Sequence, residues 1–225
     1  MATIGGVYKA VLLDVYGTLV HDDATWEVSA ASQVALSAGV SPEVVAREWT
    51  ARVWELASAA YGADFRRLVD LNLDALASTA AHFGVSVDPA RLRRPSERPW
   101  LFADSVPFLA GVDVPVCLVS DADRDPLTAV LDHHGISVAS VVTSEDARAY
   151  KPRPEPFELA LRRLGLEAAD VLHVGDSPAS DIAGAGALGI DTAWVNRHGR
   201  RLPGRLTATY TVSTLTALLP VLASA

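Results

Sequence analysis

Acidic, hydroxyl and lysine side chains follow apolar runs in four short clusters along this chain. The clusters are Asp14-Val15-Tyr16-Gly17-Thr18, Ser120-Asp121, Lys151-Pro152, and Gly175-Asp176 together with Asp181. Carboxylates, a hydroxyl and an ammonium group placed at strand ends are suited to covalent catalysis on an anionic substrate. Their order, placement and spacing would rarely coincide by chance, so we interpret them as one site.

Three of the acids are expected to converge. Asp14 and Asp176 each end an apolar run, and Asp181 falls in the first turn of a helix that Ser177-Pro178 begins. Three carboxylates at such short distances repel one another unless a cation is present. Mg²⁺ is suited to this place, because it prefers oxygen ligands and can bind a substrate phosphate at the same time. We therefore predict a Mg²⁺ site here, although each acid taken singly also fits a turn or a helix terminus.

The expected substrate contacts are Ser120, Asp121, Lys151 and Tyr16. The only lysines in the chain are Lys9 and Lys151, against a large majority of arginines. A compact ammonium group is suited to neutralising a phosphoryl or carboxylate group and the nucleophile beside it. Taken alone, Ser120 also fits a helix N-cap and Lys151 a solvated loop.

These clusters need a sheet whose strands end at one edge. Strand-length, almost continuously apolar runs occur at 10–13, 116–119, 138–142, 171–174 and 192–195, with helical patterns at 126–134, 156–164 and 178–188 between them. This alternation predicts an α/β fold with a doubly wound, Rossmann-like parallel sheet. His173 lies inside a strand and is interpreted as a packed core residue.

A helical insertion interrupts this alternation. Residues 22–100 show helical periodicity without a convincing strand, and Ser41-Pro42-Glu43 has the form of a helix start. We predict a catalytic core formed by residues 1–21 and 101–225, with residues 22–100 as a helical cap inserted after the first cluster. Aromatic side chains of the cap, including Trp49 and Trp54, are expected to pack in its core rather than line a substrate pocket.

Composition excludes several classes of function. A net charge of -8 argues against nucleic acid as the main partner, because binding to a phosphate backbone needs a clustered basic surface. Cys117 is the only cysteine, which fits a reducing cytoplasm without a disulfide framework. The uncharged stretch 206–225 is broken by threonines, so it predicts a strand near 208–212 and a terminal helix rather than a membrane span. We expect a cytoplasmic monomer or homodimer.

The four clusters resemble the motifs of the haloacid dehalogenase superfamily of hydrolases over essentially the whole chain. The resemblance implies that Asp14 is the nucleophile and that Thr18 supports its loop. It also implies that Ser120 and Lys151 bind substrate, and that Asp176 and Asp181 hold Mg²⁺. The insertion resembles the family's helical cap, which closes over the substrate and excludes water.

Tyr16 departs from the phosphatases of this family, which usually have an aspartate there as general acid and base. The Tyr16 backbone carbonyl can still bind Mg²⁺, but its phenol is a far weaker acid than a carboxyl group. Loss of acid–base assistance costs roughly a hundredfold to ten-thousandfold in rate. A phosphatase therefore needs a good leaving group or another proton donor, for which His21 is a nearby candidate.

Asp-x-Tyr-Gly-Thr also resembles the first motif of L-2-haloacid dehalogenases, which need no metal. Their fourth motif has Ser and Asn where this chain has Asp176 and Pro178, and without a metal Asp176 would repel both Asp14 and a substrate carboxylate. Arg47 and Arg52 match their cap arginine only loosely. Phosphonoacetaldehyde hydrolase also lacks the second aspartate, but it uses a cap lysine that is absent here.

We favour a Mg²⁺-dependent phosphatase that acts on a small organic phosphate, an anionic substrate, through an aspartyl phosphate on Asp14. The alternatives are a 2-haloacid dehalogenase and a weakly active or non-catalytic regulatory member of the family.

Overall fold

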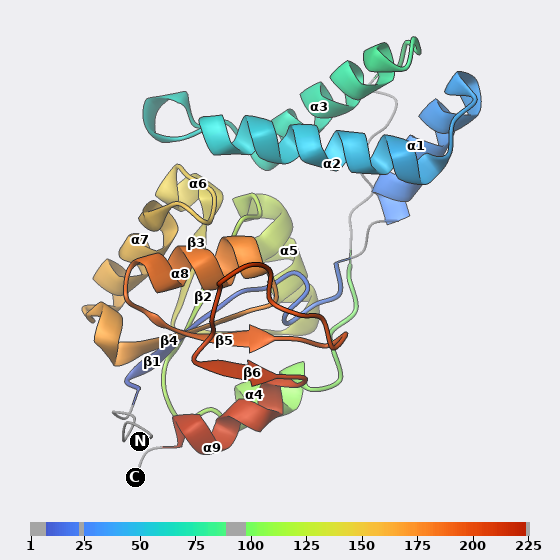
Figure 1. The fold of residues 1–225 in the computed structure, drawn as a ribbon. Helices are drawn as coiled ribbons and strands as arrows, with labels where there is room; N and C mark the ends of the chain where they lie inside the picture. Colours follow the sequence, from blue (N-terminus) through green and yellow to red (C-terminus); the bar gives the residue numbers. More distant parts are fainter. Residues whose placement is uncertain (1–7, 23–24, 89–97, 224–225) are drawn as a thin grey trace.

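The central element of the fold is a six-stranded sheet. In a computed structural model, which describes residues 8–22, 25–88 and 98–223, the strands pair in the order β3-β2-β1-β4-β5-β6, all parallel (Figure 1). The strands are β1 (Ala10–Leu13), β2 (Val116–Ser120), β3 (Ser140–Thr143), β4 (Val171–Gly175), β5 (Asp191–Val195) and β6 (Tyr210–Val212). The predicted Rossmann-like α/β fold is confirmed.

Helices cover both faces of the sheet, which explains the continuous apolar runs of the central strands. Successive side chains of a strand point to opposite faces. Val11 and Leu13 thus pack in one cluster with residues from α4, α5, η5 and α9, whereas Leu12 packs in another with residues from α7 and α8. These helices are α4 (Ser105–Gly111), α5 (Arg124–His134), α7 (Pro154–Leu164), α8 (Ala183–Ala187), η5 (Leu215–Leu218) and α9 (Leu219–Leu222). The short helix α6 (Ser144–Ala147) follows β3, and the turn η3 (Ala168–Asp170) precedes β4.

The helix expected over 178–188 is present in two parts. It begins with a π-helical turn, η4 (Pro178–Ile182), and continues as α8. Ser177 is the N-cap, and its hydroxyl accepts a hydrogen bond from the backbone N–H of Ser180 at 3.2 Å. A wider first turn of this kind is frequent at functional sites, and here it carries Asp181.

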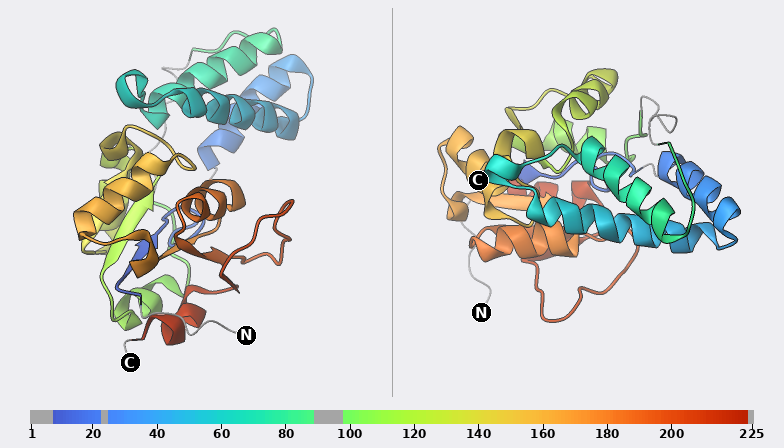
Figure 2. Two further views of the ribbon diagram at one scale, coloured as in Figure 1. Left: turned by 60° about the vertical axis from the view of Figure 1, so that its left-hand side comes forward. Right: turned by 90° about the horizontal axis from the view of Figure 1, so that it is seen from above.

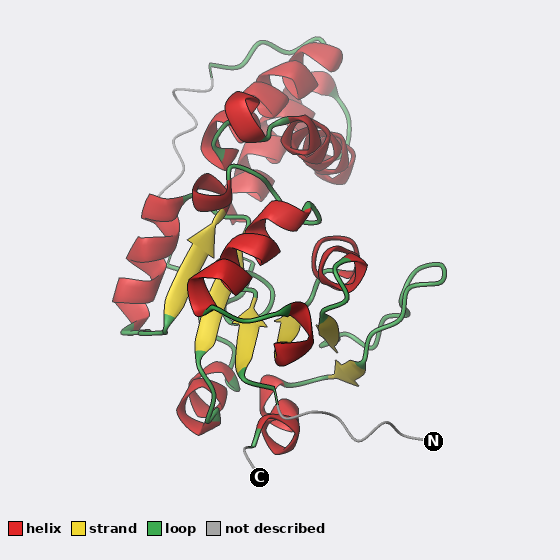
Figure 3. Cartoon of the chain, turned by 90° about the vertical axis from the view of Figure 1, so that its left-hand side faces the viewer, coloured by secondary structure: helices red, strands yellow, loops and turns green. Residues whose placement is uncertain are grey.

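Helices α1 (Thr25–Ala38), α2 (Pro42–Ala59) and α3 (Leu68–His82), with the 3₁₀ turn η1 (Gly62–Asp64), form a helical insertion between β1 and β2. This insertion has its own core, formed by small and branched side chains around Trp49. Figure 3 shows it at the end of the sheet to which the strand arrows point, and Figure 1 and the left view of Figure 2 show it on the side of the sheet away from α9. The predicted boundaries near 22 and 100 lie beside segments 23–24 and 89–97, which are outside the described residues.

The insertion contacts the core through a junction around Tyr150 and Asp123. The Tyr150 ring stacks on Phe65 with centroids 5.5 Å apart, and its hydroxyl donates to the backbone carbonyl of Arg66 at 2.8 Å. The Asp123 carboxylate accepts hydrogen bonds from the backbone N–H groups of Leu68 and Val69 at 2.8 and 2.9 Å. These contacts position the start of α3 over the strand ends.

None of the helices in the part of the chain that the structure describes is both long enough and apolar enough to cross a membrane.

Candidate active site

A cavity of about 670 Å³ lies where the helical insertion faces the carboxyl ends of the strands. Loops after β1, β2, α6 and β4 supply most of its polar wall, and α2, α3 and α5 supply most of its apolar wall. The sequence-predicted residues that line it are Asp14, Tyr16, Ser120, Asp121, Lys151, Asp176 and Asp181. The carboxyl edge of a parallel sheet is where open α/β folds bind ligands. Sequence clusters far apart in the chain are thus brought to one cavity.

Thr18 is the predicted site residue that does not line the cavity. It is fully buried, and its backbone carbonyl accepts a hydrogen bond from the Arg197 guanidinium at 2.8 Å. Its place is in the turn that follows Asp14, where it can support the loop.

Lys151 connects two carboxylates. Its Nζ atom donates to Asp14 Oδ1 at 2.8 Å and to Asp181 Oδ1 at 2.7 Å, and all three side chains are buried. Burial by itself would lower the pKa of Lys151, but the charges of Asp14 and Asp181 raise it above its usual value. Burial raises the pKa of Asp14, an effect that the Lys151 ammonium group opposes. Lys151 therefore stays protonated and fixes one oxygen of Asp14.

Asp181 has hydrogen-bond partners on both oxygens. Besides Lys151, Oδ1 lies 3.0 Å from His173 Nε2, and Oδ2 accepts from the backbone N–H of Ser177 at 2.9 Å. Although burial favours its neutral form, Lys151 and His173 together hold the pKa of Asp181 well below its usual range. A Cβ atom on Gly175 would lie 2.3 Å from Asp181 Cγ, so the glycine is what allows this carboxylate to lie against the end of β4.

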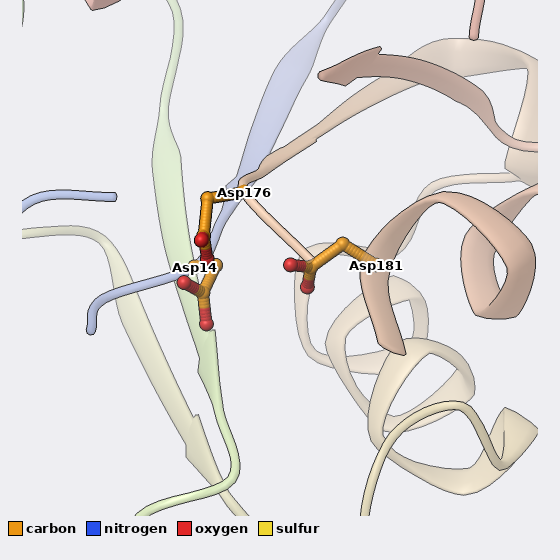
Figure 4. A group of neighbouring side chains, drawn as sticks. All are labelled: Asp14, Asp176 and Asp181. Carbon is orange, nitrogen blue, oxygen red and sulfur yellow. The ribbon is translucent and has the colours of Figure 1, made fainter. Parts of the chain in front are cut away.

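Asp14, Asp176 and Asp181 offer oxygen atoms that all lie within 4.8 Å of one another (Figure 4). Asp14 Oδ2 is buried without a hydrogen-bond partner. Burial, followed by the charges of Asp14 and Asp181, raises the pKa of Asp176 to about 7. Arg200 Nη2 lies 3.7 Å from Asp176 Oδ2 but is half exposed, so it compensates this charge only in part. A buried unpartnered oxygen beside a partly compensated carboxylate matches the oxygen ligands that Mg²⁺ prefers. The residues present therefore fit the expected metal ion.

Gly17 provides the space for this arrangement. Its φ of +82° is a left-handed conformation that favours glycine, and a Cβ atom here would lie 2.7 Å from Asp176 Oδ1. The loop after Asp14 therefore passes directly beside the Asp176 carboxylate.

Ser120 ends β2 and Asp121 follows it, on the other side of β1 from β4 and Asp176. Asp121 Oδ1 accepts a hydrogen bond from the backbone N–H of Lys151 at 2.7 Å, and Ser120 Oγ accepts one from the backbone N–H of Ala122 at 3.2 Å. Burial raises the pKa of Asp121 to about 7, against the opposing charge of Lys151. Asp121 can thus hold a proton near neutral pH.

The structure shows where His21 and His173 lie relative to the site. His21, considered as a proton donor, stacks on Phe102 with ring centroids 3.9 Å apart and does not line the cavity. His173 is buried as expected, but it also contacts Asp181, and periodicity gives no signal for that contact. Trp54 lines the cavity instead of packing wholly in the core of the insertion.

Family comparison agrees with this geometry. A model of haloacid dehalogenase-like hydrolases matches residues 8–189, which include all four sequence clusters. The chain belongs to this family. Members of the haloacid dehalogenase-like family similar to it include enzymes with different chemistry.

An (S)-2-haloacid dehalogenase from Pseudomonas putida is 25% identical over 202 residues, which cover 84% of this chain and 85% of the relative. A phosphoglycolate phosphatase from Rhodospirillum rubrum is 31% identical over 190 residues, covering 81% and 77% of the two chains. The structure of L-2-haloacid dehalogenase from Xanthobacter autotrophicus superposes with a TM-score of 0.76 at 22% identity, over 95% of this chain and 98% of that one. At this identity, the likeness to the solved structure shows the fold alone.

Proposed function

We propose that this haloacid dehalogenase-like hydrolase is a Mg²⁺-dependent phosphatase that forms an aspartyl phosphate on Asp14. The observation that carries the proposal is the position of Asp176, whose carboxylate lies within reach of Asp14. Its ion-pair partner among the described residues is the half-exposed Arg200, 3.7 Å away, which compensates its charge only in part. Without a cation, this carboxylate repels both the nucleophile and an anionic substrate. The phosphoglycolate phosphatase relative supports the same chemistry.

In this proposal, Asp14 attacks the phosphorus atom, the alcohol oxygen leaves, and water then hydrolyses the aspartyl phosphate. Lys151 holds Asp14 Oδ1 at 2.8 Å and contributes positive charge beside the phosphoryl group, and Ser120 contributes a hydroxyl. Asp14 Oδ2, Asp176, Asp181 and the Tyr16 carbonyl would hold Mg²⁺, which when bound neutralises phosphoryl charge. Asp181 positions Lys151.

The leaving alcohol needs a proton that Tyr16 is poorly suited to give. Asp121 lines the same cavity and has a pKa raised to about 7, so its carboxyl group is the proton donor that we assign. The helical insertion serves as the cap in this mechanism, because Trp54, Leu68 and Val69 close the cavity opposite Asp14.

Haloacid dehalogenation is the second candidate, favoured by Tyr16 in the first motif and by the (S)-2-haloacid dehalogenase relative. A 2-haloacid brings a carboxylate that needs a cation. Among the described residues that line the cavity, Lys151 is the only cationic side chain, and it already contacts Asp14 and Asp181. This shortage of positive charge favours the phosphatase.

One comparison tests the two enzyme functions. Phosphate release from small phosphate monoesters should require Mg²⁺, stop on addition of a chelator, and disappear in Asp14→Asn and Asp176→Asn. Halide release from a 2-haloacid that continues in the presence of chelator would overturn the phosphatase. A folded protein without activity on either class would instead support a non-catalytic role, and loss of a measured activity in Asp14→Asn excludes that role.

A further inference from the structure

The part of the cavity beyond the reaction centre has an apolar wall. Trp54 of α2 and Leu68 and Val69 of α3 line it from the insertion, and Pro126, Ala129 and Val130 line it from α5. Trp54 keeps 43% of its surface exposed, which is unusual for so large an apolar side chain. An open indole facing a cavity is suited to contact with an aromatic or aliphatic group of a ligand.

The charges that line the cavity are almost all negative. In the part of the chain that the structure describes, seven aspartates contribute, and they are Asp14, Asp22, Asp121, Asp123, Asp125, Asp176 and Asp181. Among the described lining residues, Lys151 is the single cation, and its ammonium group is bound to Asp14 and Asp181. Asp123 is compensated by two backbone N–H groups of α3.

Asp22 and Asp125 are different, because both are exposed and neither has an ion-pair partner within the described segments. Lys151 and a bound Mg²⁺ together carry three positive charges, which the carboxylates of Asp14, Asp176 and Asp181 balance. The half-exposed Arg200 does not line the cavity, and its guanidinium is paired with Asp176 at 3.7 Å. The described residues that line the cavity offer no further positive charge for an anionic group on the leaving alcohol. The outer cavity therefore has a negative potential that repels anions and attracts cations.

We infer that the substrates are phosphate monoesters of alcohols that carry no anionic group, have an apolar body that contacts Trp54, and are bound better with an ammonium group near Asp22 and Asp125. The inference rests on the proposed phosphatase and selects among its substrates. It places phosphoglycolate, which carries a carboxylate, among the poor substrates, in contrast to the function named for the Rhodospirillum rubrum relative.

Three phosphate esters with three-carbon alcohols test the inference. They differ in the charge at the far end of the alcohol, which is neutral in propyl phosphate, cationic in 3-aminopropyl phosphate and anionic in 3-phosphonooxypropanoate. They are called the neutral, cationic and anionic esters after that charge. In the presence of Mg²⁺, we expect kcat/KM to be highest for the cationic ester, lower for the neutral ester and lowest for the anionic ester. The ratio of cationic to anionic ester should be about tenfold or more at low salt and shrink as salt screens the exposed carboxylates.

Variants assign the selectivity to named residues. Asp22→Asn with Asp125→Asn should bring the ratio close to one while keeping activity on propyl phosphate. Asp132→Asn is the matched control, because it removes the same charge from an exposed position on α5 that does not line the cavity. Trp54→Ala should raise KM for phenyl phosphate more than for methyl phosphate.

A preference for the anionic ester overturns the inference while leaving the phosphatase intact, as does an unchanged ratio in the double variant. Absence of phosphate release from every ester in the presence of Mg²⁺ overturns the proposed function, and the inference falls with it.

Discussion

The Nε2 atom of His173 lies 3.0 Å from Asp181 Oδ1, the same oxygen that Lys151 Nζ contacts at 2.7 Å. An ionised carboxylate can only accept, so His173 donates this hydrogen bond. The imidazole also contacts the Phe157 ring edge-on, with centroids 5.0 Å apart, which fixes its plane. His173 is therefore a positioning residue that orients Asp181 toward Lys151 and, through Lys151, toward Asp14.

Replacing His173 tests that role. In His173→Leu, Asp181 loses a buried donor, and we expect a loss of roughly 1–3 kcal/mol in the free energy of unfolding. We also expect a weaker affinity for Mg²⁺, measured by titration calorimetry, and a lower kcat. His173→Gln keeps an N–H donor and should restore most of the metal affinity. Equal metal affinity in the Leu, Gln and wild-type proteins would contradict the positioning role.

Asp121 should make the stability of the metal-free protein depend on pH. Its pKa is about 7 in the folded chain against an ordinary value of 3.8, because burial disfavours the charged form. The native state then holds a proton that the unfolded chain releases. The contribution of Asp121 to the free energy of unfolding is therefore fully present below about pH 4 and is lost as pH rises toward 7.

Asp121→Asn should make this decline shallower, since the amide oxygen still accepts from Lys151 N–H and carries no charge. The remaining decline comes from Asp176, whose pKa burial also raises to about 7. Thermal unfolding between pH 4 and 8 measures the effect, with Asp132→Asn as the exposed control. Parallel decline of wild type and Asp121→Asn would show that Asp121 is not responsible.

The leaving group should decide how much Asp121 matters for catalysis. An alkyl phosphate releases an alcohol that needs a proton, whereas 4-nitrophenyl phosphate releases a stable phenolate. We expect Asp121→Asn to lower kcat about a hundredfold or more for the alkyl ester and much less for the aryl ester. Steady-state kinetics with both esters gives the result. A uniform loss for both would instead indicate a role in binding or folding.

Gly17→Ala should abolish metal binding without removing a ligand. An added Cβ atom would lie 2.7 Å from Asp176 Oδ1, and the φ of +82° is strained for alanine. We expect the rise in melting temperature on addition of Mg²⁺, present in the wild type, to be lost. Gly135→Ala is the matched control for backbone strain, because Gly135 has a φ of +63° and no atom within 4 Å of its Cβ position. A normal Mg²⁺ response in Gly17→Ala would refute the close packing.

Asp123 connects the loop of Ser120 to the first turn of α3. Its two oxygens accept from the Leu68 and Val69 amides at 2.8 and 2.9 Å, so it acts as a helix cap supplied by another part of the chain. Asp123→Ala should cost about 1 kcal/mol in stability. It should also speed hydrogen exchange at these two amides. Asp125→Ala, two residues away and exposed, should leave their exchange unchanged, and equal exchange in the two variants would contradict the capping role.

The sequence by itself determined the parallel sheet and the position of the candidate catalytic residues at the ends of its strands. Apolar runs of strand length alternate with helical patterns, and the polar clusters directly follow those runs, as at Asp14 and Asp176. Both signals are local, because a strand covered on both faces must be apolar along its length. The departure at Tyr16 is equally visible in the chain, and it raises the question of what donates the proton.

Only the tertiary structure decided which charges meet. Lys151 and Asp14 are 137 positions apart and Asp123 and Leu68 are 55 apart, so no periodicity reports their contacts. His173 has the pattern of an ordinary core residue, and its bond to Asp181 depends on the π-helical turn after β4. The shortage of positive charge in the cavity likewise arises from packing, because seven aspartates and one lysine of the described segments surround a single space.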